Sequence, residues 1–247
     1  SLGAARNMVA QIFQHYDWNT PNTPCNYLLL GYEPEGCISL GTSFTDQFLC
    51  QFAPVNRVAY ALRRTGGGHE FDGFGVIAAL QSFAEEGLPV RIFGFPAFLW
   101  QTLQRMQATG VADLQLAEGS LTLFGGGWKT HAAQEIPRQQ LYERIHRQLG
   151  IKMSRCRDGY GAVEHAVPYL ECAHHHFHVP VYSKVFVRHP ADFTVQPYGR
   201  QGLLSFVSPY ISSSPAHAVV MSDLATLHPG VSCGCGLSTD WFELHGR

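Results

Sequence analysis

The sequence predicts an α/β fold, with a mainly parallel sheet flanked by helices, followed by a smaller and mostly β lobe. Over residues 1–150, short apolar runs alternate with segments whose apolar residues recur at helical spacing, which is typical of parallel sheets covered by helices. From about residue 152, apolar runs follow one another without long helical segments between them. We therefore expect an α/β subdomain over residues 1–150 and a strand-rich part over residues 151–247.

Apolar periodicity and breaker residues indicate each element in turn. Helices are expected around residues 8–13, over residues 71–86 before the Gly-Leu-Pro at 87–89, after the Gly-Phe-Pro at 94–96 as far as residue 110, and over residues 137–149. Strands are expected at residues 27–30, 90–93, 121–124, 179–187, 203–207, 217–221 and 241–244.

Composition narrows the functional class. The chain has 247 residues, of which 45% are hydrophobic and 15% charged, and its 17 basic residues are outnumbered by 19 acidic ones. A nucleic-acid partner is not expected, because phosphate binding needs a basic surface. No apolar run approaches the roughly 20 residues of a membrane span, and no leader sequence opens the chain, so we expect a cytoplasmic protein. Seven cysteines, an odd number, favour reduced thiols or metal ligands over a disulfide framework.

A glycine triplet at residues 125–127, followed by Trp128 and Lys129, closes the apolar run at 121–124. Glycines at the end of a strand expose bare backbone, on which a flat ligand can lie. The triplet therefore suggests a nucleotide-sized planar group bound beyond the carboxyl end of a strand. A plain glycine-rich turn is the alternative interpretation.

Four later residues complete a possible nucleotide site. Tyr160, next to Gly161, offers an aromatic face for stacking a base, and Glu164 can hold magnesium near phosphates. Asp223 follows an apolar run and can accept hydrogen bonds from both ribose hydroxyls, and Arg247 can contact the ribose or a phosphate. Taken singly, these residues are equally consistent with a core tyrosine, a solvated glutamate, a turn aspartate and a surface arginine.

In this order, the motifs resemble those of the adenylate-forming ligases, which activate a carboxylic acid with ATP as an acyl-adenylate and pass the acyl group to a thiol. GGGWK at 125–129, IFGFP at 92–96 and FHVP at 177–180 are similar to the LuxE-type acyl-protein synthetases. YGAVE at 160–164, EC at 171–172, GGG at 66–68 and CGCG at 233–236 are more similar to phenylacetate-coenzyme A ligases. The resemblance covers essentially the whole chain.

The resemblance implies a role for each motif residue, with ATP and Mg²⁺ as cofactors. Gly126 and Gly127 would flank the adenine, Tyr160 with Gly161 would stack on it, Glu164 would bind magnesium, and Asp223 and Arg247 would hold the ribose. Gly94, Gly68 and His69 would border the pocket for a fatty or aryl acid, although His69 is also consistent with a solvated loop histidine. The acceptor thiol would belong to coenzyme A or to a protein cysteine.

The sequence also departs from that family pattern. It shows no Ser/Thr/Gly-rich phosphate loop early in the chain, and it stops at Arg247, before the small mobile domain that supplies a catalytic lysine in the family. We therefore expect a chain truncated at both ends. Three functions remain open: a LuxE-type acyl-protein synthetase, an aryl- or acyl-coenzyme A ligase, and a non-catalytic relative that serves as a partner or binding subunit.

Cysteine spacing predicts a structural zinc site. Cys172 lies six positions before His178, and Cys233 and Cys235 return about sixty residues later in a C-x-C-G turn. Three sulfurs and one imidazole form a tetrahedral Zn²⁺ set that leaves no position open for water. His176 is the substitute ligand, and reduced buried thiols are the alternative. A metallohydrolase built on His174, His176 and His178 is less well supported, because no HExxH motif accompanies them. The other cysteines, Cys25, Cys37, Cys50 and Cys156, are expected to be buried thiols.

Overall fold

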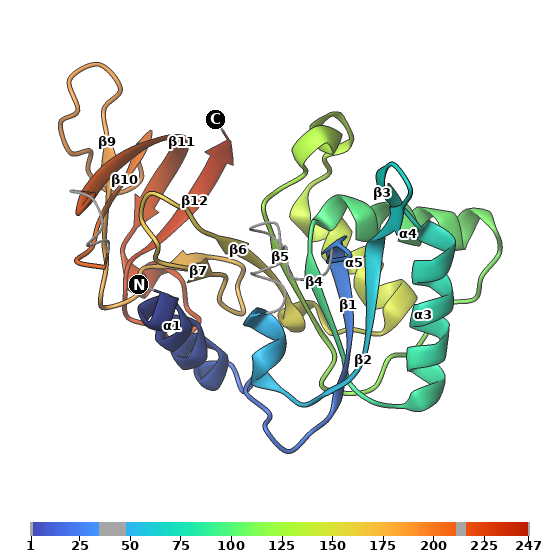
Figure 1. Ribbon diagram of the computed structural model, residues 1–247. Coiled ribbons are helices and arrows are strands. Elements are labelled where there is room, and N and C mark those ends of the chain that lie inside the picture. The colour runs from blue at the N-terminus through green and yellow to red at the C-terminus, as the bar shows by residue number, and fades with distance from the viewer. Residues whose placement is uncertain (1, 35–47, 211–215, 247) are drawn as a thin grey trace. The chain divides into compact units, whose positions relative to one another are not determined.

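The structure is a computed structural model that describes residues 2–34, 48–210 and 216–246 (Figure 1). It divides into two compact units, each described by itself: residues 13–157 form the α/β unit, and residues 1–12 with 158–247 form the strand-rich unit. The division falls a few residues after the expected one, and the first twelve residues belong to the strand-rich unit. Within the described ranges, no helix is long and apolar enough to cross a membrane.

The α/β unit is built on a mostly parallel sheet. Its strands, in the order in which they pair, are β3 (Gly68–Phe71), β2 (Val55–Thr65), β1 (Cys25–Tyr32), β4 (Val90–Gly94) and β5 (Leu121–Gly125). β2, β1, β4 and β5 run parallel, whereas β3 pairs antiparallel with β2 through a short hairpin. Because parallel strands end at the same edge, the carboxyl ends of β1, β4 and β5 lie together.

Three helices cover one face of this sheet: α3 (Gly73–Glu86), α4 (Pro96–Ala108) and α5 (Arg138–Leu149) (Figure 1). Asp72 caps α3 by accepting a 2.8 Å hydrogen bond from the Gly75 N–H, and Gly87 ends it in the left-handed conformation. Apolar side chains of the three helices share one buried core with those of the sheet. The boundaries expected from glycine and proline are confirmed to within a few residues.

The other face of the sheet carries aromatic side chains. Tyr27 and Phe93 point to it from β1 and β4, with ring centroids 5.9 Å apart. Phe13, at the end of α1 (Leu2–His15), packs against Trp18 and against Phe52 of the short helix η1 (Cys50–Phe52). The remaining 3₁₀ helices are η2 (Lys129–Gln134), η3 (Met153–Arg155) and η4 (Gly230–Ser232).

The strand-rich unit combines a short hairpin with an antiparallel sheet. β6 (Cys156–Tyr160) pairs with β7 (Tyr169–Leu170). The five-stranded sheet has the order β8 (Phe177–His178), β12 (Trp241–Gly246), β11 (Ala218–His228), β10 (Gln201–Val207) and β9 (Lys184–Arg188). Their apolar faces enclose a second core rich in aromatic rings, including Tyr169, Phe177, Phe206 and Phe242. The lobe is therefore mostly β, as the sequence predicts.

Two expectations about strands were wrong or incomplete. The continuous strand expected over residues 179–187 is interrupted by a turn, in which the Ser183 N–H bonds to the Pro180 carbonyl at 3.0 Å, and only Lys184–Arg188 forms β9. Proline lacks the N–H that a ladder needs. No strand was expected at β2, although residues 58–62 form a short apolar run; most of residues 55–60 are exposed.

Candidate functional site

The two glycines expected to flank the adenine follow the end of β5. Gly126 and Gly127 have φ values of 78° and 66°, in the left-handed region that side chains other than glycine rarely adopt. A Cβ added to Gly127 would meet no atom within 4 Å, so conformation rather than crowding favours glycine there. Trp128 is buried in the core of the α/β unit, and the side chain of Lys129 lies outside the described residues. The strand end thus presents open backbone.

Gly94 lies at the neighbouring strand end, on β4. It pairs with Leu30 of β1 and with Phe124 of β5, and its φ is 119°. A Cβ at this position would lie 3.0 Å from the carbonyl carbon and oxygen of Leu30. Gly94 is therefore required for the close approach of β1, and it lies at the same sheet edge as the glycines that follow β5.

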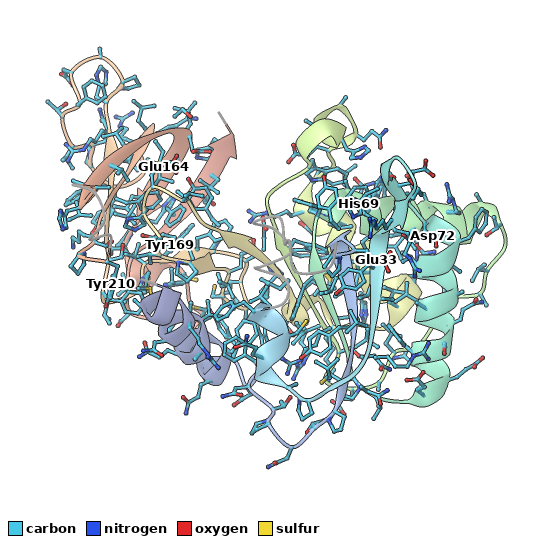
Figure 2. The ribbon with its side chains drawn as sticks, in the orientation of Figure 1. Glu33, His69, Asp72, Glu164, Tyr169 and Tyr210 are labelled. Atoms are coloured by element: carbon cyan, nitrogen blue, oxygen red, sulfur yellow. The ribbon has the colours of Figure 1, made fainter. Side chains whose placement is uncertain are left out.

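His69, expected at the acid pocket, is fixed by backbone contacts. It lies on β3, and its Nε2 is 2.7 Å from the carbonyl oxygen of Glu33, which requires the tautomer that carries the proton on Nε2 (Figure 2). Its ring also lies edge-on to Tyr32, with centroids 5.2 Å apart. Gly68, with φ of 147°, begins the same strand. His69 is thus a half-buried residue held beside the segment that follows β1, rather than a solvated loop histidine.

The strand-rich unit brings two of the expected nucleotide residues into contact. The Tyr160 hydroxyl, at the end of β6, donates a 3.3 Å hydrogen bond to Oδ2 of Asp223. Asp223 is 8% exposed, and it lies within β11 rather than after it. At this point Leu203 of β10 opposes Leu224, whereas Ser205 opposes Val220, so residues 221–223 bulge opposite residue 204. A bulge of this kind re-aims side chains and is common beside active sites.

Glu164 lies in an exposed turn between β6 and β7 (Figure 2). The turn, which begins after Gly161, is closed by two backbone hydrogen bonds, from the His165 and Ala166 N–H groups to the Ala162 carbonyl at 3.0 and 2.9 Å. An exposed carboxylate suits magnesium, which keeps several of its waters when it binds phosphates. Arg247, the second expected ribose contact, lies outside the described residues, as does Cys37.

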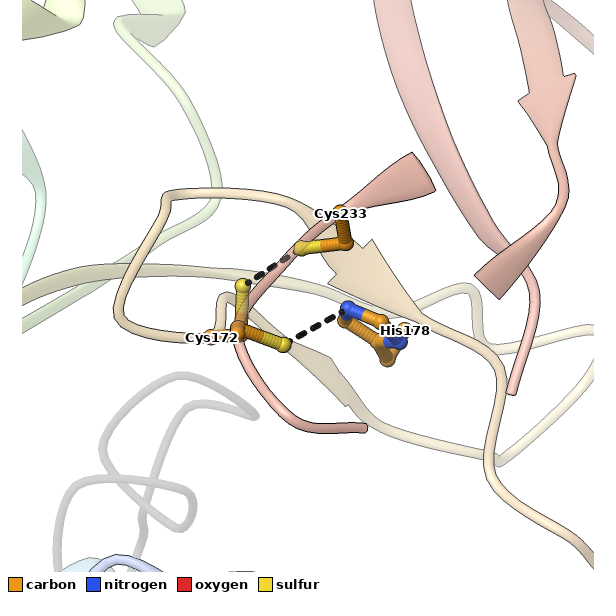
Figure 3. Close-up of side chains that lie close together, drawn as sticks. Cys172, His178 and Cys233 are labelled. Carbon is orange, nitrogen blue, oxygen red and sulfur yellow. Dashed lines mark hydrogen bonds between the residues drawn. The ribbon is translucent and has the colours of Figure 1, made fainter. Parts of the chain in front are cut away.

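The four expected zinc ligands converge in the strand-rich unit. The ligand atoms of Cys172, His178, Cys233 and Cys235 all lie within 4.8 Å of one another. The sulfurs of Cys172 and Cys233 are 3.6 Å apart, and the Cys235 sulfur is 3.3 Å from Nε2 of His178 (Figure 3). The spacing predicted in the sequence is thus a compact cluster in space, with three members fully buried and Cys235 half-buried.

The surroundings of the cluster suit metal binding. Nδ1 of His178 lies 2.8 Å from the Thr239 carbonyl, so Nδ1 carries the proton and Nε2 keeps its lone pair toward the sulfurs. Burial lowers the pKa of His178, which keeps the ring neutral. Burial also raises the pKa of the Cys172 thiol, and that of Cys233 to about 12. A bound divalent cation would reverse this effect on the thiols, because it stabilises thiolates.

The neighbouring histidines are occupied by other contacts. His176 stacks on Trp241, with centroids 3.7 Å apart, and its Nδ1 lies 3.1 Å from the Cys233 sulfur. His174 places Nδ1 2.8 Å from the Cys233 carbonyl. Among the described residues, the set with metal-binding geometry is therefore the cysteine-rich one with His178, and His176 lies beside it.

Sequence reasoning missed the residues that support these groups. Thr239 orients His178 through a backbone carbonyl, which no side-chain pattern reveals. Glu171 is fully buried and accepts a 2.8 Å hydrogen bond from the Asp158 N–H across the hairpin, directly before Cys172. A signal for Glu171 was present, because the Glu-Cys pair at 171–172 is one of the motifs that carry the family resemblance, although it assigned this glutamate no role.

Solved structures share the fold of this chain. The chain superposes on a 2-hydroxyisobutyryl-CoA ligase in complex with 2-HIB-AMP and CoA, with a TM-score of 0.59, 13% identity, and coverage of 99% of this chain and 53% of that one. For ATP-bound MatB from Rhodopseudomonas palustris, the TM-score is 0.57 and the identity 13%, with coverage of 98% of this chain and 44% of that one. For the amide bond synthetase McbA from Marinactinospora thermotolerans, the TM-score is 0.52 and the identity 15%, with coverage of 97% of this chain and 44% of that one. The fold is that of the adenylate-forming ligases, and the chain spans about half the length of these proteins.

The family follows from the sequence match. The family model described as acyl-protein synthetase, LuxE, matches residues 71–247, and the chain belongs to this family. No curated protein gave a significant match.

Proposed function

We propose that this chain supplies nucleotide- and acid-binding parts of an ATP-dependent ligase, which activates a fatty or aryl carboxylic acid as an acyl-adenylate and transfers the acyl group to a thiol. One observation carries the proposal. The chain belongs to the acyl-protein synthetase family, and Tyr160 and Asp223 are distant in its sequence. In the structure, the bulge of β11 brings the Asp223 carboxylate to the Tyr160 hydroxyl. An aromatic ring can stack on a nucleotide base, and a neighbouring carboxylate can accept hydrogen bonds from the ribose hydroxyls.

Within each unit, the proposed roles follow from local geometry. In the α/β unit, the backbone at Gly126 and Gly127 would lie against the adenine, and Gly94 with the His69 hairpin would border the acid. In the strand-rich unit, Tyr160 with Gly161 would stack on the base and Asp223 would accept hydrogen bonds from the ribose. Glu164 would hold Mg²⁺, and Arg247 would contact the ribose.

The chemistry requires positioning more than proton transfer. The acid carboxylate attacks the α-phosphorus of ATP, the acyl–oxygen–phosphorus bond forms, and pyrophosphate leaves with its negative charge offset by Mg²⁺. Both reactants are anionic, so the protein contributes by alignment and by electrostatic stabilisation, and no general base is needed. In the second step, a thiolate attacks the mixed anhydride and AMP leaves.

The identity of the acceptor thiol is also part of the proposal. Membership in the acyl-protein synthetase family favours a protein cysteine. A coenzyme A ligase is the second candidate, because one structure with the same fold holds both an acyl-AMP and CoA. A non-catalytic relative acting as a partner or binding subunit is the third.

We further propose that Cys172, His178, Cys233 and Cys235 bind one structural Zn²⁺ ion. The compact cluster, the oriented Nε2 of His178 and the burial of Cys172 and Cys233 support this. Four protein ligands complete a tetrahedron, so the metal would hold chain segments together rather than activate water. Thiolate ligands also require a reducing compartment, which favours the cytoplasm.

The test of the main proposal is acid-dependent exchange of labelled pyrophosphate into ATP, run across fatty and aryl acids on the full-length gene product. We expect exchange with at least one acid class, and none without acid. Failure of every acid, together with no measurable ATP binding, would sink both enzymatic candidates and leave the non-catalytic one. The acceptor is then identified with a labelled acid in two reactions, one with coenzyme A and one without any added thiol. Label in acyl-CoA indicates a coenzyme A ligase, and label bound to protein without added thiol indicates a protein cysteine.

A further inference from the structure

A buried polar cluster, formed by His165, Tyr169 and Ser183, adjoins the turn that carries Glu164. Nε2 of His165 is 2.8 Å from the Tyr169 hydroxyl and 3.2 Å from the Ser183 hydroxyl, and these two hydroxyls are 2.6 Å apart. The three residues come from the turn, from β7 and from the loop before β9. The cluster therefore ties the turn to two other segments of the strand-rich unit.

The histidine is held by its ring as well as by its nitrogen. His165 is fully buried and stacks on Phe206 of β10, with centroids 4.4 Å apart and an interplanar angle of 16°. Burial lowers the pKa of His165 to about 4, so the ring is neutral at ordinary pH. Among the described residues, no hydrogen-bond partner meets its Nδ1 atom. The polar contacts of the ring are thus concentrated on Tyr169 and Ser183.

The other side chains of residues 163–166 contribute little packing to the turn. Val163 is 93% exposed and Glu164 is exposed, so neither side chain packs into the core. Ala166 has a left-handed backbone with φ of 60°, a conformation that costs about 1 kcal/mol or more for a residue other than glycine. His165 is the buried side chain within the turn, and Val167, buried in the core of the same unit, follows it. The polar contacts of the turn side chains with the rest of the unit are therefore made through His165.

We infer that His165 is a positioning residue: its hydrogen bonds with Tyr169 and Ser183 hold the turn so that the Glu164 carboxylate is presented to the Mg²⁺–ATP of the proposed adenylation. This inference rests on the proposed function, because it assigns the turn a ligand. The cluster acts through Glu164 and does not touch the reacting atoms.

The test compares His165→Leu with His165→Gln in the full-length protein. Leucine keeps the apolar volume and loses the hydrogen bonds, whereas the glutamine amide reaches about where Nε2 lies. In acid-dependent pyrophosphate exchange, we expect His165→Leu to raise the apparent KM for Mg²⁺ on the order of tenfold, as loss of an outer partner of a metal ligand commonly does. His165→Gln should restore most of the wild-type value.

Val187→Ala is the matched control, because Val187 is buried in the same core on β9, a strand that does not pair with β11. It should lower the melting temperature and leave the Mg²⁺ dependence unchanged. If His165→Leu and Val187→Ala shift that dependence equally, or if neither shifts it, the positioning role is wrong and His165 is only a core residue.

Hydrogen exchange separates this outcome from failure of the proposed function. In the wild-type protein, the His165 and Ala166 amides should be protected by the Ala162 carbonyl, and His165→Leu should release them while Val187→Ala does not. Equal protection in all three proteins would overturn the anchoring itself. A wild-type protein that exchanges no pyrophosphate with any acid, yet shows the expected protection, would refute the proposed function and with it the role of Glu164, while the anchor stands.

Discussion

Asp223 is positioned by an irregularity in its strand. Three residues of β11, 221–223, lie opposite residue 204 of β10, and the third of them carries the carboxylate that Tyr160 contacts. Regular pairing would have left side chains alternating strictly between the two faces of the sheet. The sequence indicates the aspartate but not the bulge, because register depends on pairing with a distant strand.

Replacing Asp223 by asparagine should weaken ATP binding on the order of tenfold or more, because a hydrogen bond to a charged group contributes about 1.5–3 kcal/mol. Equilibrium titration with ATP measures the effect. The strand-rich unit offers a matched control: Tyr198 donates a 2.9 Å hydrogen bond to Asp240, so Asp240→Asn removes a similar charge from a similar pair. Equal losses in the two variants would mean that Asp223 has no special role.

Two of the positive-φ glycines at the sheet edge, Gly94 and Gly127, should differ in their tolerance of alanine. Gly94→Ala should lower the free energy of unfolding by about 3 kcal/mol, because the new Cβ is both strained and pressed against the Leu30 carbonyl. Gly127→Ala should cost only about 1 kcal/mol, because its surroundings are open. Urea unfolding of both variants measures the difference, and the reverse order would contradict the close approach of β1 and β4.

Acid should destabilise the protein through His165. Its folded pKa of about 4 lies below the ordinary value of 6.5, so between these values the unfolded chain binds more protons and stability falls as pH falls. The contribution is fully present above pH 6.5, and its full loss is about 3 kcal/mol near pH 4. The wild-type protein should therefore lose more free energy of unfolding than His165→Gln between pH 7 and 5. Parallel pH profiles would refute this assignment.

At the scale of elements, the metal cluster connects segment ends. Cys172 follows β7, His178 ends β8, and Cys233 and Cys235 lie in the connection from β11 to β12. β8 and β12 are joined by only two residue pairs, Trp241 with His178 and Phe242 with Phe177. So short a pairing is weak by itself, and a metal ligand at its end would stabilise it.

Metal analysis tests the proposed zinc cluster directly. The purified native protein should contain about one equivalent of zinc, and a Cys233→Ser, Cys235→Ser double variant should contain none and melt at a lower temperature. Cys25→Ser is the control, because Cys25 is buried but lies on β1 of the α/β unit, and it should retain the metal. A native protein that is folded and free of metal would end the zinc proposal.

Local signals predicted the elements well where one residue sets a boundary. The end of α3 at Gly87 and the start of α4 at Pro96 were evident from the sequence. β2 was not expected, because its first four residues are exposed, only the apolar run at 58–62 marks it, and its pairing with β1 is a tertiary event. The cysteine cluster was predictable from spacing, whereas the contacts of His165 depend on Ser183 and Phe206, which are distant in sequence.

At the scale of the whole molecule, the chain carries proposed nucleotide residues in both compact units. Gly126 and Gly127 belong to the α/β unit, and Tyr160 and Asp223 belong to the strand-rich unit. Sequence alone predicted both the fold class and the family. The solved structures confirm the fold class, and the family match over residues 71–247 confirms the family. The activity of the whole protein follows from these parts only as a proposal.

Direct detection of the acyl-adenylate tests that proposal most closely. The full-length protein is incubated with ATP, Mg²⁺ and either a fatty or an aryl acid in the absence of a thiol, then quenched and analysed by mass spectrometry. We predict acyl-AMP in amounts comparable to the enzyme with one acid class, and much less with Asp223→Asn. Intact ATP binding without acyl-AMP from any acid would contradict the account.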